Sequence, residues 1–437
     1  MGTGSRGGPR AQGPDDGSSS ELLPVDEHLQ AVLDSVTLLP AVPAPLRDAT
    51  GLVLAADVAS AVDLPLWDNS AMDGYAVRAA DTAAASATSP VRLRIVGEVA
   101  AGDGEDPELP PGAAVRIMTG APLPSSADAV VPVEHTSADV SGAVWAEHHV
   151  LVERAAEPGA HVRRRGEDVL VGGIVAQSGD RLGARRAAAI AAAGVSAVLV
   201  RPRPRVAVIA TGAELRSIEG PGDAALERGR IPESNSVLIA ALLAEDGIEP
   251  VTVEVCDDDA AAFAERLARL GGRVDAVITT GGVGPGVHDV VRIALAAEPG
   301  VRAVRVAVKP GQPQCFGRLR GGALIFALPG NPVSAAVSYE LFVRPALLRM
   351  QGASRLHRPS TPATADSGWR GRADRTQVLP VRVRTTSDGL RCAPAVDARG
   401  YSHAVGGHGA ADGYAIVEPG RGDVAAGETV ETVVVAW

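Results

Sequence analysis

The chain has 437 residues and a formal net charge of −11, with 46% hydrophobic and 21% charged residues. These proportions are ordinary for a water-soluble globular protein, and the length exceeds what one compact core accommodates, so we expect about two to four domains. The acidic balance disfavours a nucleic-acid-binding protein, which normally carries a basic face. The most apolar run, residues 187–200, is too short to span a bilayer.

The N-terminal residues and the cysteines indicate where the protein is found. Residues 1–20 are rich in Gly, Ser and Pro and lack an apolar stretch, so we predict a disordered tail and no signal peptide. Cys256, Cys315 and Cys392 are far apart and show no metal-ligand spacing, as is usual in a reducing compartment. We therefore expect a cytoplasmic protein without nucleic-acid or membrane partners.

The first half of the chain is predicted to be mostly β-structure. Residues 21–59 and 173–203 are interpreted as helical and linking segments, with an Ala-rich helix and a following strand inside 183–200. Residues 60–172 are expected to form a β-rich domain, because short Val-containing runs alternate there with Pro and Gly.

The clearest architecture lies in residues 204–350. Strands are predicted at residues 205–212, 250–255, 275–282, 301–311 and 323–331, and helices at 234–247, 259–272, 289–298 and 333–350. Alternating strands and helices with short connections indicate an α/β domain with a doubly wound, mostly parallel sheet covered on both faces. A linker is predicted at 354–368, and residues 355–437 are expected to form a C-terminal β-barrel domain.

Four loops of the α/β domain follow predicted strands and therefore lie on one edge of its sheet. They are "ATGAEL" (210–215), "TTGGVGPGVHD" (279–289), "KPGQP" (309–313) and "LPGNPVS" (328–334). Ligands of such sheets bind at the carboxyl ends of the strands, near helix N-termini. Glycines let backbone N–H groups approach an anion. The four loops predict a site for a phosphate or similar oxyanion, although any one of them could be only a tight turn.

Lys309 is the single lysine among 41 basic residues. A compact ammonium enters a narrow oxyanion pocket where a wide guanidinium does not fit. The alternative is a solvated lysine placed by chance. Glu214, Asp289 and one of Asp257 or Asp258 are expected on the same edge, where they could hold Mg²⁺ beside an anion. Each carboxylate alone could instead cap a helix, and Asp289 occupies such a position.

Several longer motifs occur together with these loops. They are "DNSAMDGYAVR" (68–78), "RIMTGAPLPSSADAVVPVE" (116–134) and "RRRGEDV" (163–169). In this combination and order the chain resembles, from about residue 21 onward, the molybdopterin molybdenumtransferases, the MoeA family, which includes the C-terminal domain of gephyrin. The resemblance implies an elongated homodimer whose α/β domain binds molybdopterin and whose cleft includes the SAMDGYA-bearing domain of the other subunit.

The resemblance also implies the reaction. Family members take adenylylated molybdopterin and molybdate, use Mg²⁺, release AMP and leave molybdenum on the dithiolene of the cofactor. A molybdopterin adenylyltransferase and molybdoenzyme-maturation proteins are possible partners. By the same resemblance, the residues expected to be catalytic are Asp73, Asp168, Glu214, Asp289 and Lys309. Those expected to bind the cofactor are Thr119, Gly281, Gly282, Arg305, Pro329, Gly330, Asn331, Arg375 and Ser402, and the metal ligands would be Glu214, Asp257 and Asp289.

Some of these assignments have simpler alternatives. The "NSAMDGYA" segment could be only a buried turn, and "RRRGED" only a solvated run of charges. The chain also departs from the family pattern at Ala213, Gly284 and Gln312, where Asp, Ser and Lys are usual. These changes motivate a second hypothesis, a pterin-binding or assembly protein without turnover. A third, molybdopterin adenylylation, is disfavoured by the flanking domains.

Overall fold

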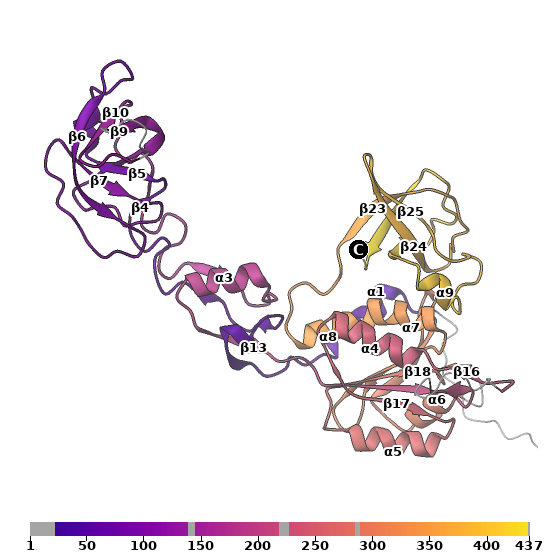
Figure 1. Ribbon diagram of the computed structural model, residues 1–437. Helices are drawn as coiled ribbons and strands as arrows, with labels where there is room; N and C mark the ends of the chain where they lie inside the picture. Colours follow the sequence, from indigo (N-terminus) through magenta and orange to yellow (C-terminus); the bar gives the residue numbers. More distant parts are fainter. Residues whose placement is uncertain (1–21, 139–144, 218–226, 285–288, 436–437) are drawn as a thin grey trace, which may run out of the picture. The chain divides into compact units, whose positions relative to one another are not determined.

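The computed structural model describes residues 22–138, 145–217, 227–284 and 289–435 (Figure 1). The predicted disordered tail and residues 285–288 of the glycine-rich loop lie outside them. The chain divides into a smaller unit, residues 41–200, and a larger unit, which joins residues 22–40 to residues 201–435. Within the described residues, every helix is too short or too polar to cross a membrane.

The larger unit is built on a six-stranded sheet. Four neighbouring strands are parallel, and the last two run antiparallel to their neighbours. The order is β17 (Pro250–Cys256), β14 (Val206–Thr211), β18 (Ala276–Thr280), β22 (Leu324–Leu328), β21 (Pro313–Arg318) and β19 (Val301–Arg305). This confirms the predicted doubly wound, mostly parallel sheet. Strand β21 was not predicted.

Helices cover both faces of this sheet, as Figure 1 shows. They are α1 (Val25–Asp34), α4 (Asn235–Glu245), α5 (Ala260–Leu270), α6 (Val290–Leu295), α7 (Pro332–Ser338) and α8 (Arg344–Met350). Every residue of β14 is buried, because its alternating side chains enter different cores. Val208 packs in the core that includes Ile239 of α4, and Ile209 in the core that includes Phe263 of α5.

The helix predicted at residues 333–350 is interrupted. A π-helical turn, Tyr339–Val343, separates α7 from α8. Pro345 has no N–H to donate to the carbonyl four residues earlier, which favours such an irregularity at this point. Helix α5, by contrast, begins as its sequence indicates, because the carboxylate of Asp259 accepts hydrogen bonds from two backbone N–H groups of the first turn at 2.9 and 3.0 Å.

The single strand predicted at residues 301–311 is wrong. Strand β19 ends at Arg305, where the N-terminal segment inserts: Leu23 N donates to Arg305 O at 2.8 Å, and Ala307 N donates to Leu23 O at 2.7 Å. The chain then forms β20 (Val308–Lys309), which pairs with a strand of the C-terminal sheet. The "KPGQP" loop therefore follows a strand of that sheet and not a parallel strand of the central one.

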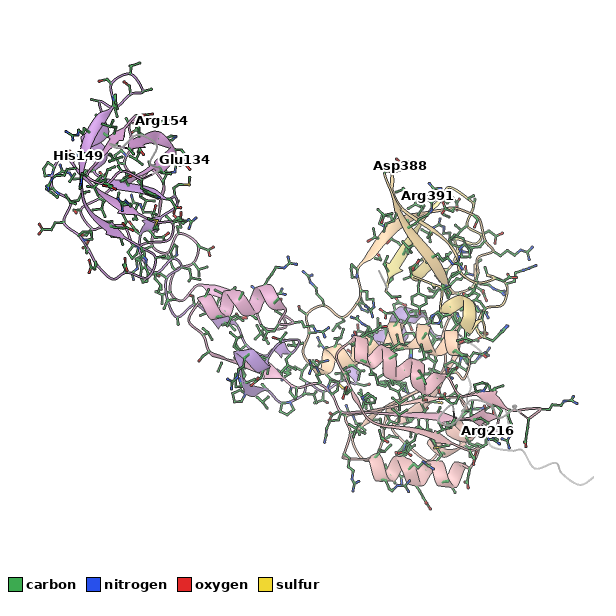
Figure 2. The ribbon with its side chains drawn as sticks, in the orientation of Figure 1. Glu134, His149, Arg154, Arg216, Asp388 and Arg391 are labelled. Carbon is green, nitrogen blue, oxygen red and sulfur yellow. The ribbon has the colours of Figure 1, made fainter. Side chains whose placement is uncertain are left out.

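The C-terminal residues form a closed five-stranded barrel, as predicted. Its strands are β24 (Thr376–Thr386), β25 (Gly389–Pro394), β23 (Ser360–Ala365), β27 (Thr429–Val434) and β26 (Gly413–Val417), and β26 pairs back with β24. Strand β23 lies in the predicted linker, which is a correction: Ala363 and Ala365 alternate into the barrel core. Figure 2 labels Asp388 and Arg391 on the β24–β25 hairpin, where the Arg391 guanidinium bonds Asp366 at 2.5 Å.

The smaller unit is rich in β-structure. Its main sheet has the order β8 (Ala129–Pro132), β5 (Gly74–Val77), β7 (Ala113–Ile117), β6 (Val91–Val99), β10 (His149–Val152) and β9 (Thr136–Ala138). A second core joins β1 (Val42–Pro45), β2 (Val53–Leu54), β3 (Val58–Ala59), β12 (Ile174–Ala176), α3 (Ala184–Ala192) and β13 (Ala197–Arg201). Val32 of α1 lies in a core of the larger unit. The predicted domain boundaries within these units stay a prediction.

Candidate functional site

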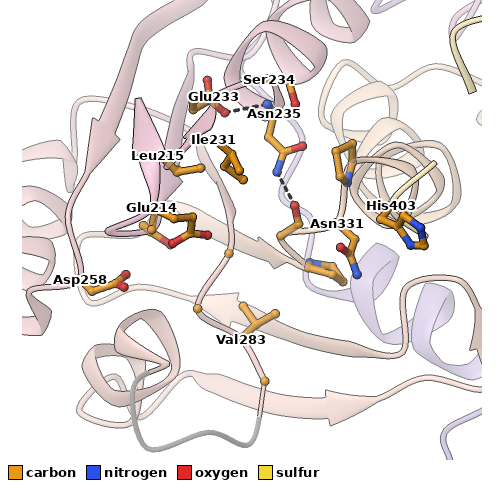
Figure 3. A pocket seen from close by; sticks show the side chains of 18 of the residues that line it. Glu214, Leu215, Ile231, Glu233, Ser234, Asn235, Asp258, Val283, Asn331 and His403 are labelled. Carbon is orange, nitrogen blue, oxygen red and sulfur yellow. Dashed lines mark hydrogen bonds between the residues drawn. The ribbon is translucent and has the colours of Figure 1, made fainter. Parts of the chain in front are cut away.

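A cavity of about 720 Å³ lies in the larger unit, at the carboxyl ends of β14, β18 and β22 (Figure 3). We call it the main cavity. Three of the four loops singled out in the sequence line it at these strand ends, through Gly212 and Glu214 after β14, Gly281 to Gly284 after β18, and Pro329 to Pro332 after β22, and the fourth loop contributes Pro313. Parallel strands bring their ends to one edge, which is why loops from distant parts of the sequence meet here.

Glycines allow these loops to approach one another closely. Gly281 has a φ of 96°, and a Cβ built on it would lie 2.4 Å from the Thr211 carbonyl oxygen of the neighbouring strand. A Cβ on Gly330 would lie 3.3 Å from the Cα of Gly281. The contact between loops therefore requires glycine at Gly281 whether or not a ligand is bound.

The start of α4 forms another wall of the main cavity. The buried carboxylate of Glu233 accepts hydrogen bonds from the backbone N–H groups of Asn235, at 2.6 Å, and Ser236, at 2.9 Å. The helix is thus capped by Glu233, while the Ser234 side chain makes no cap hydrogen bond. Asn235 donates from Nδ2 to the carbonyl oxygen of Gly330 at 2.7 Å, which ties α4 to the loop after β22.

Acidic side chains dominate the charged lining of the main cavity. Glu214, Glu233, Asp258 and Asp289 all contribute, and the described lining contains no lysine or arginine. Asp258 accepts a hydrogen bond from the backbone N–H of Ala213 at 3.1 Å, whereas Asp257 is not among the described lining residues. Asp258 is therefore the carboxylate of this run that reaches the cavity. Asp289 occupies the N-cap position of α6, but its side chain makes no cap hydrogen bond there.

The carboxylates of the main cavity do not form a metal cage by themselves. Across the described ranges, no three side chains of His, Cys, Asp or Glu are arranged to hold one ion. The predicted set of Glu214, Asp257 and Asp289 is thus not assembled, and the lining offers Asp258 in place of Asp257.

A second cavity of about 250 Å³ adjoins the first and shares Pro313, Pro329 and Asn331 with it. We call it the side cavity. It brings together Lys309, Arg375 and Ser402, three predicted residues that are far apart in sequence. Arg375 donates to the Gln312 side-chain oxygen at 3.2 Å. Asn331 Nδ2 donates to the Ser402 hydroxyl at 3.3 Å, so the α/β loops and the barrel both form its walls.

Lys309 is held in place by Tyr401, a buried residue of the barrel domain. The Tyr401 hydroxyl lies 3.0 Å from the carbonyl oxygen of Lys309 and 3.2 Å from that of Val378, and its single proton is shared between these two acceptors. The Lys309 ammonium lies 5.8 Å from the centre of the Tyr401 ring, within the range of a cation–π interaction. Burial lowers the pKa of Lys309, and the nearby Arg372 and Arg375 guanidinium groups lower it further.

Several residues differ from expectation. Arg305 lies at the end of β19, lines neither cavity among the described residues, and is exposed, so the structure does not bring it to the site. His403 lines the main cavity, although no pattern in the sequence pointed to it.

Two of the departures from the family pattern lie near the main cavity. Ala213 is exposed and is not among the described lining residues. A Cβ on Gly284 would lie 3.1 Å from Asp289 Oδ2, so glycine leaves room beside that carboxylate.

The remaining predicted residues belong to the smaller unit. Asp73 precedes β5 and Thr119 follows the neighbouring β7, and Asp73 accepts hydrogen bonds from Thr119 N at 2.7 Å and Thr119 Oγ1 at 2.8 Å. These bonds hold the pKa of Asp73 below its usual value. Both residues are exposed, so the turn of "NSAMDGYA" is not buried at Asp73, although the segment ends in the buried strand β5.

The "RRRGED" segment forms ion pairs with other residues of the smaller unit. Arg164 pairs with Asp68 and Arg165 with Asp63, each at 2.6 Å, so two of its charges are not simply solvated. Asp168 itself is exposed, and its backbone N–H donates to Leu64 O at 3.0 Å.

A β-rich unit, a doubly wound α/β core with a cavity at its strand ends, and a closed barrel together define a multidomain protein of the MoeA type. Family models match three consecutive regions: the MoeA N-terminal region, domains I and II, at residues 23–194; the probable molybdopterin binding domain at residues 207–349; and the MoeA C-terminal region, domain IV, at residues 362–435.

Individual relatives agree with these matches. The chain is 41% identical over 345 residues to molybdopterin molybdenumtransferase 2 of Mycobacterium tuberculosis, covering 78% of this chain and 82% of that protein. It is 31% identical to the molybdopterin molybdenumtransferase of Haemophilus influenzae, covering 88% and 91%. A crystal structure of a molybdopterin biosynthesis MoeA protein from Pyrococcus horikoshii superposes with a TM-score of 0.79 at 28% identity, covering 95% of this chain and all of that one.

The chain belongs to the molybdopterin molybdenumtransferase family, and it is a transferase.

Proposed function

We propose that this protein inserts molybdenum from molybdate into adenylylated molybdopterin, releasing AMP and leaving molybdenum cofactor. The observation that carries the proposal is the pair of adjoining cavities with opposite charge. The main cavity is acidic and large enough for a heterocyclic ligand, and the side cavity is small and basic. Two compartments in contact could hold an organic substrate and an inorganic oxyanion side by side, as this reaction requires.

The side cavity suits molybdate. Lys309 supplies positive charge, Arg375 adds a guanidinium that Asp374 partly neutralises, Ser402 supplies a hydroxyl, and its described lining contains no carboxylate. Charge-assisted hydrogen bonds from such donors bind oxyanions strongly. Burial is the main cause of the lowered pKa of Lys309 and the Arg372 and Arg375 guanidinium groups add to it, so an anion bound beside the ammonium would offset both effects.

The main cavity suits the pterin and its nucleotide, provided that a cation accompanies the phosphates. Its carboxylates would repel a bare pyrophosphate. Mg²⁺ usually binds through one or two protein carboxylates together with substrate phosphates and water, so it does not need the three-carboxylate cage that the described residues lack. We infer that Asp258 or Asp289, with Glu214, would hold a magnesium ion that arrives with the substrate. When bound, Mg²⁺ would polarise the phosphate bond to AMP.

The smaller unit contributes through a second subunit in this proposal. Asp73, Thr119 and Asp168 are exposed on it, and the Asp73 carboxylate is fixed and favoured in its ionised form by Thr119. We infer a homodimer in which they face the cavities of the partner. A molybdopterin adenylyltransferase would supply the substrate. We place the reaction in the cytoplasm, since all three cysteines are buried free thiols.

The test uses purified full-length protein with adenylylated molybdopterin, molybdate and Mg²⁺. We expect active cofactor and stoichiometric AMP. Lys309→Arg and Asp289→Ala should each reduce insertion at least about 10-fold, the loss expected for one charged contact, without changing the far-ultraviolet circular dichroism spectrum. Arg305→Ala is the control, because Arg305 is exposed and lines neither cavity among the described residues. Wild-type rates in both variants would overturn the site assignment.

The same assay separates the other hypotheses. New adenylylation of molybdopterin from ATP would indicate an adenylyltransferase. Tight binding without product would indicate an assembly protein that has lost turnover, the possibility raised by Ala213, Gly284 and Gln312. The Gln312 side chain bonds Arg375 in the side cavity, so the position still contributes to the site.

A further inference from the structure

The side chain of Asn235 contains an acceptor that the fold leaves unused. Asn235 is the first residue of α4, lines the main cavity and is only 8% exposed. In Figure 3 its side chain extends from the start of the helix toward the loop after β22, between the side chains of Ile231 and Asn331. Among the described residues, nothing donates a hydrogen bond to its Oδ1.

The orientation of the amide is determined by its neighbour. Nδ2 lies 2.7 Å from the carbonyl oxygen of Gly330, which can only accept, so the nitrogen must be on that side and Oδ1 on the other. The backbone N–H of Asn235 is already bound by Glu233. Rotating the amide would place two oxygen atoms against each other, so the unused acceptor is a fixed feature of the cavity wall.

The other acceptor at the start of α4 is occupied. Glu233 receives the N–H groups of Asn235 and Ser236 on one carboxylate oxygen and the Ser236 hydroxyl on the other. A buried acceptor without a partner is unfavourable, and most such groups in proteins are satisfied by protein, water or ligand. Of the acceptors at the start of α4, Asn235 Oδ1 is thus the one at which a hydrogen bond from a ligand would stabilise the complex most.

The chemistry of the partner follows from the acceptor. Molybdate and ionised phosphate present only acceptor oxygens, so Asn235 Oδ1 would repel them. A pterin ring presents N–H and amino donors along one edge. We propose that Asn235 is a specificity-determining residue for the pterin end of the substrate, with Oδ1 accepting a hydrogen bond from that donor edge. This inference rests on the proposed function, which places the pterin in the main cavity.

The loop after β22 makes the assignment geometrically consistent. Gly330 receives the Asn235 amide, and the next residue, Asn331, lines both cavities. A ligand whose ring lies against Asn235 can therefore extend along this loop toward Lys309 and Arg375. The ring-recognition point and the oxyanion compartment would be connected by one short segment.

The experiment measures the affinity of the full-length protein for two probes by calorimetry. One is 6-hydroxymethylpterin, and the other is the same compound methylated at N3 and dimethylated on the 2-amino group, which removes the N–H donors of that ring edge and keeps the hydroxymethyl group. We expect wild type to bind the first about 10-fold more tightly than the second. We expect Asn235→Ala and Asn235→Leu to bind the first probe about 10-fold more weakly and to distinguish the two probes by less than about 2-fold, since one hydrogen bond of this kind accounts for a factor near ten.

Gln351→Leu is the matched control. Gln351 is a buried amide of the same unit whose Nε2 donates to the Leu347 carbonyl oxygen at 3.1 Å, and it lines neither cavity among the described residues. It should leave both affinities unchanged, and molybdate affinity should be unchanged in all three variants. The comparison of probes on wild type needs no substitution, so it stands even where a variant fails to fold.

The outcomes separate the two levels of inference. If wild type binds neither probe, the proposed function fails. If wild type binds both equally and the Asn235 variants match it, the proposed role of Asn235 is overturned while the proposed function stands. Loss of molybdate affinity in the Asn235 variants would also overturn it, because the effect would then be a general distortion of the loop.

Discussion

Substituting Tyr401 tests whether the barrel holds the lysine of the side cavity in place. The Tyr401 hydroxyl donates to the Lys309 and Val378 carbonyl oxygens, and its ring lies beneath the Lys309 ammonium. Tyr401→Phe removes the hydroxyl and keeps the ring, whereas Tyr401→Leu removes both. Comparing the two variants therefore separates the effect of the hydrogen bonds to the backbone from the effect of the cation–π interaction with the ammonium.

The size of each effect follows from these contacts. Losing one donor that satisfies buried carbonyl groups costs about 1–3 kcal/mol. In Tyr401→Phe, amide hydrogen exchange in β20 and β24 should therefore become about 5- to 150-fold faster, if exchange proceeds through opening of this pairing. Losing the cation–π interaction adds about 0.5–2 kcal/mol, so Tyr401→Leu should bind molybdate about 2- to 30-fold more weakly than Tyr401→Phe.

Tyr414→Phe is the control. Its hydroxyl is also buried in the barrel, but it bonds His408 at 2.8 Å and does not touch Lys309. It should leave the molybdate affinity unchanged. Unchanged hydrogen exchange in Tyr401→Phe, or equal molybdate affinities in the Phe and Leu variants at position 401, would refute the reasoning.

Three further predictions concern other contacts. Molybdate affinity should fall as the pH rises through the pKa of Lys309, which lies below its usual value of 10.5, and Arg372→Gln should move this midpoint upward in a titration because one cause of the depression is removed. Asp246→Ala should reduce the free energy of unfolding by about 3–5 kcal/mol in urea denaturation, because it leaves the Arg344 guanidinium, bonded at 2.9 Å and only 11% exposed, without its carboxylate partner. Gly74→Ala should destabilise the smaller unit by at least about 1–3 kcal/mol, measured by hydrogen exchange, because the new Cβ would lie 2.1 Å from a carbonyl oxygen of β8.

Each of these predictions has a result that contradicts it. An unmoved midpoint in Arg372→Gln would show that the guanidinium does not act on Lys309. A urea midpoint like that of wild type in Asp246→Ala would show that the ion pair is not buried in solution. Gly74→Ala should not alter molybdate binding to the larger unit, so a change there would contradict a purely local clash.

Much of the central sheet could be predicted, because each of its parallel strands is specified locally. Short continuous apolar runs rich in β-branched residues, such as residues 206–211, are typical of strands buried on both faces. The caps and terminal glycines of α4 and α5 lie within a few residues of the helices that they end. The position of the cavity could also be predicted from the alternation of strands and helices, since the loops that follow parallel strands lie at one edge of the sheet.

The parts that were not predicted depend on contacts between distant residues. Strand β19 ends where Leu23 bonds the backbone of Arg305 and Ala307. Leu23 lies far from these residues in the sequence, so the local pattern around residue 305 gives no sign of this end. Strand β23 consists of small and polar residues, of which only Ala363 and Ala365 are buried, by the barrel around them. Asn235 and His403 belong to the site because of neighbours far away in sequence, so their local patterns carry no sign of it.

Because β20 pairs with β24, the position of Lys309 depends on both the α/β domain and the barrel domain. Its backbone belongs to a strand of the barrel sheet, while the loops around its side chain come from the α/β core. The core by itself supplies the four carboxylates of the main cavity, whereas Arg375, Ser402 and the strand that pairs with β20 come from the barrel. The barrel therefore adds a second, basic compartment beside the acidic one that the core provides.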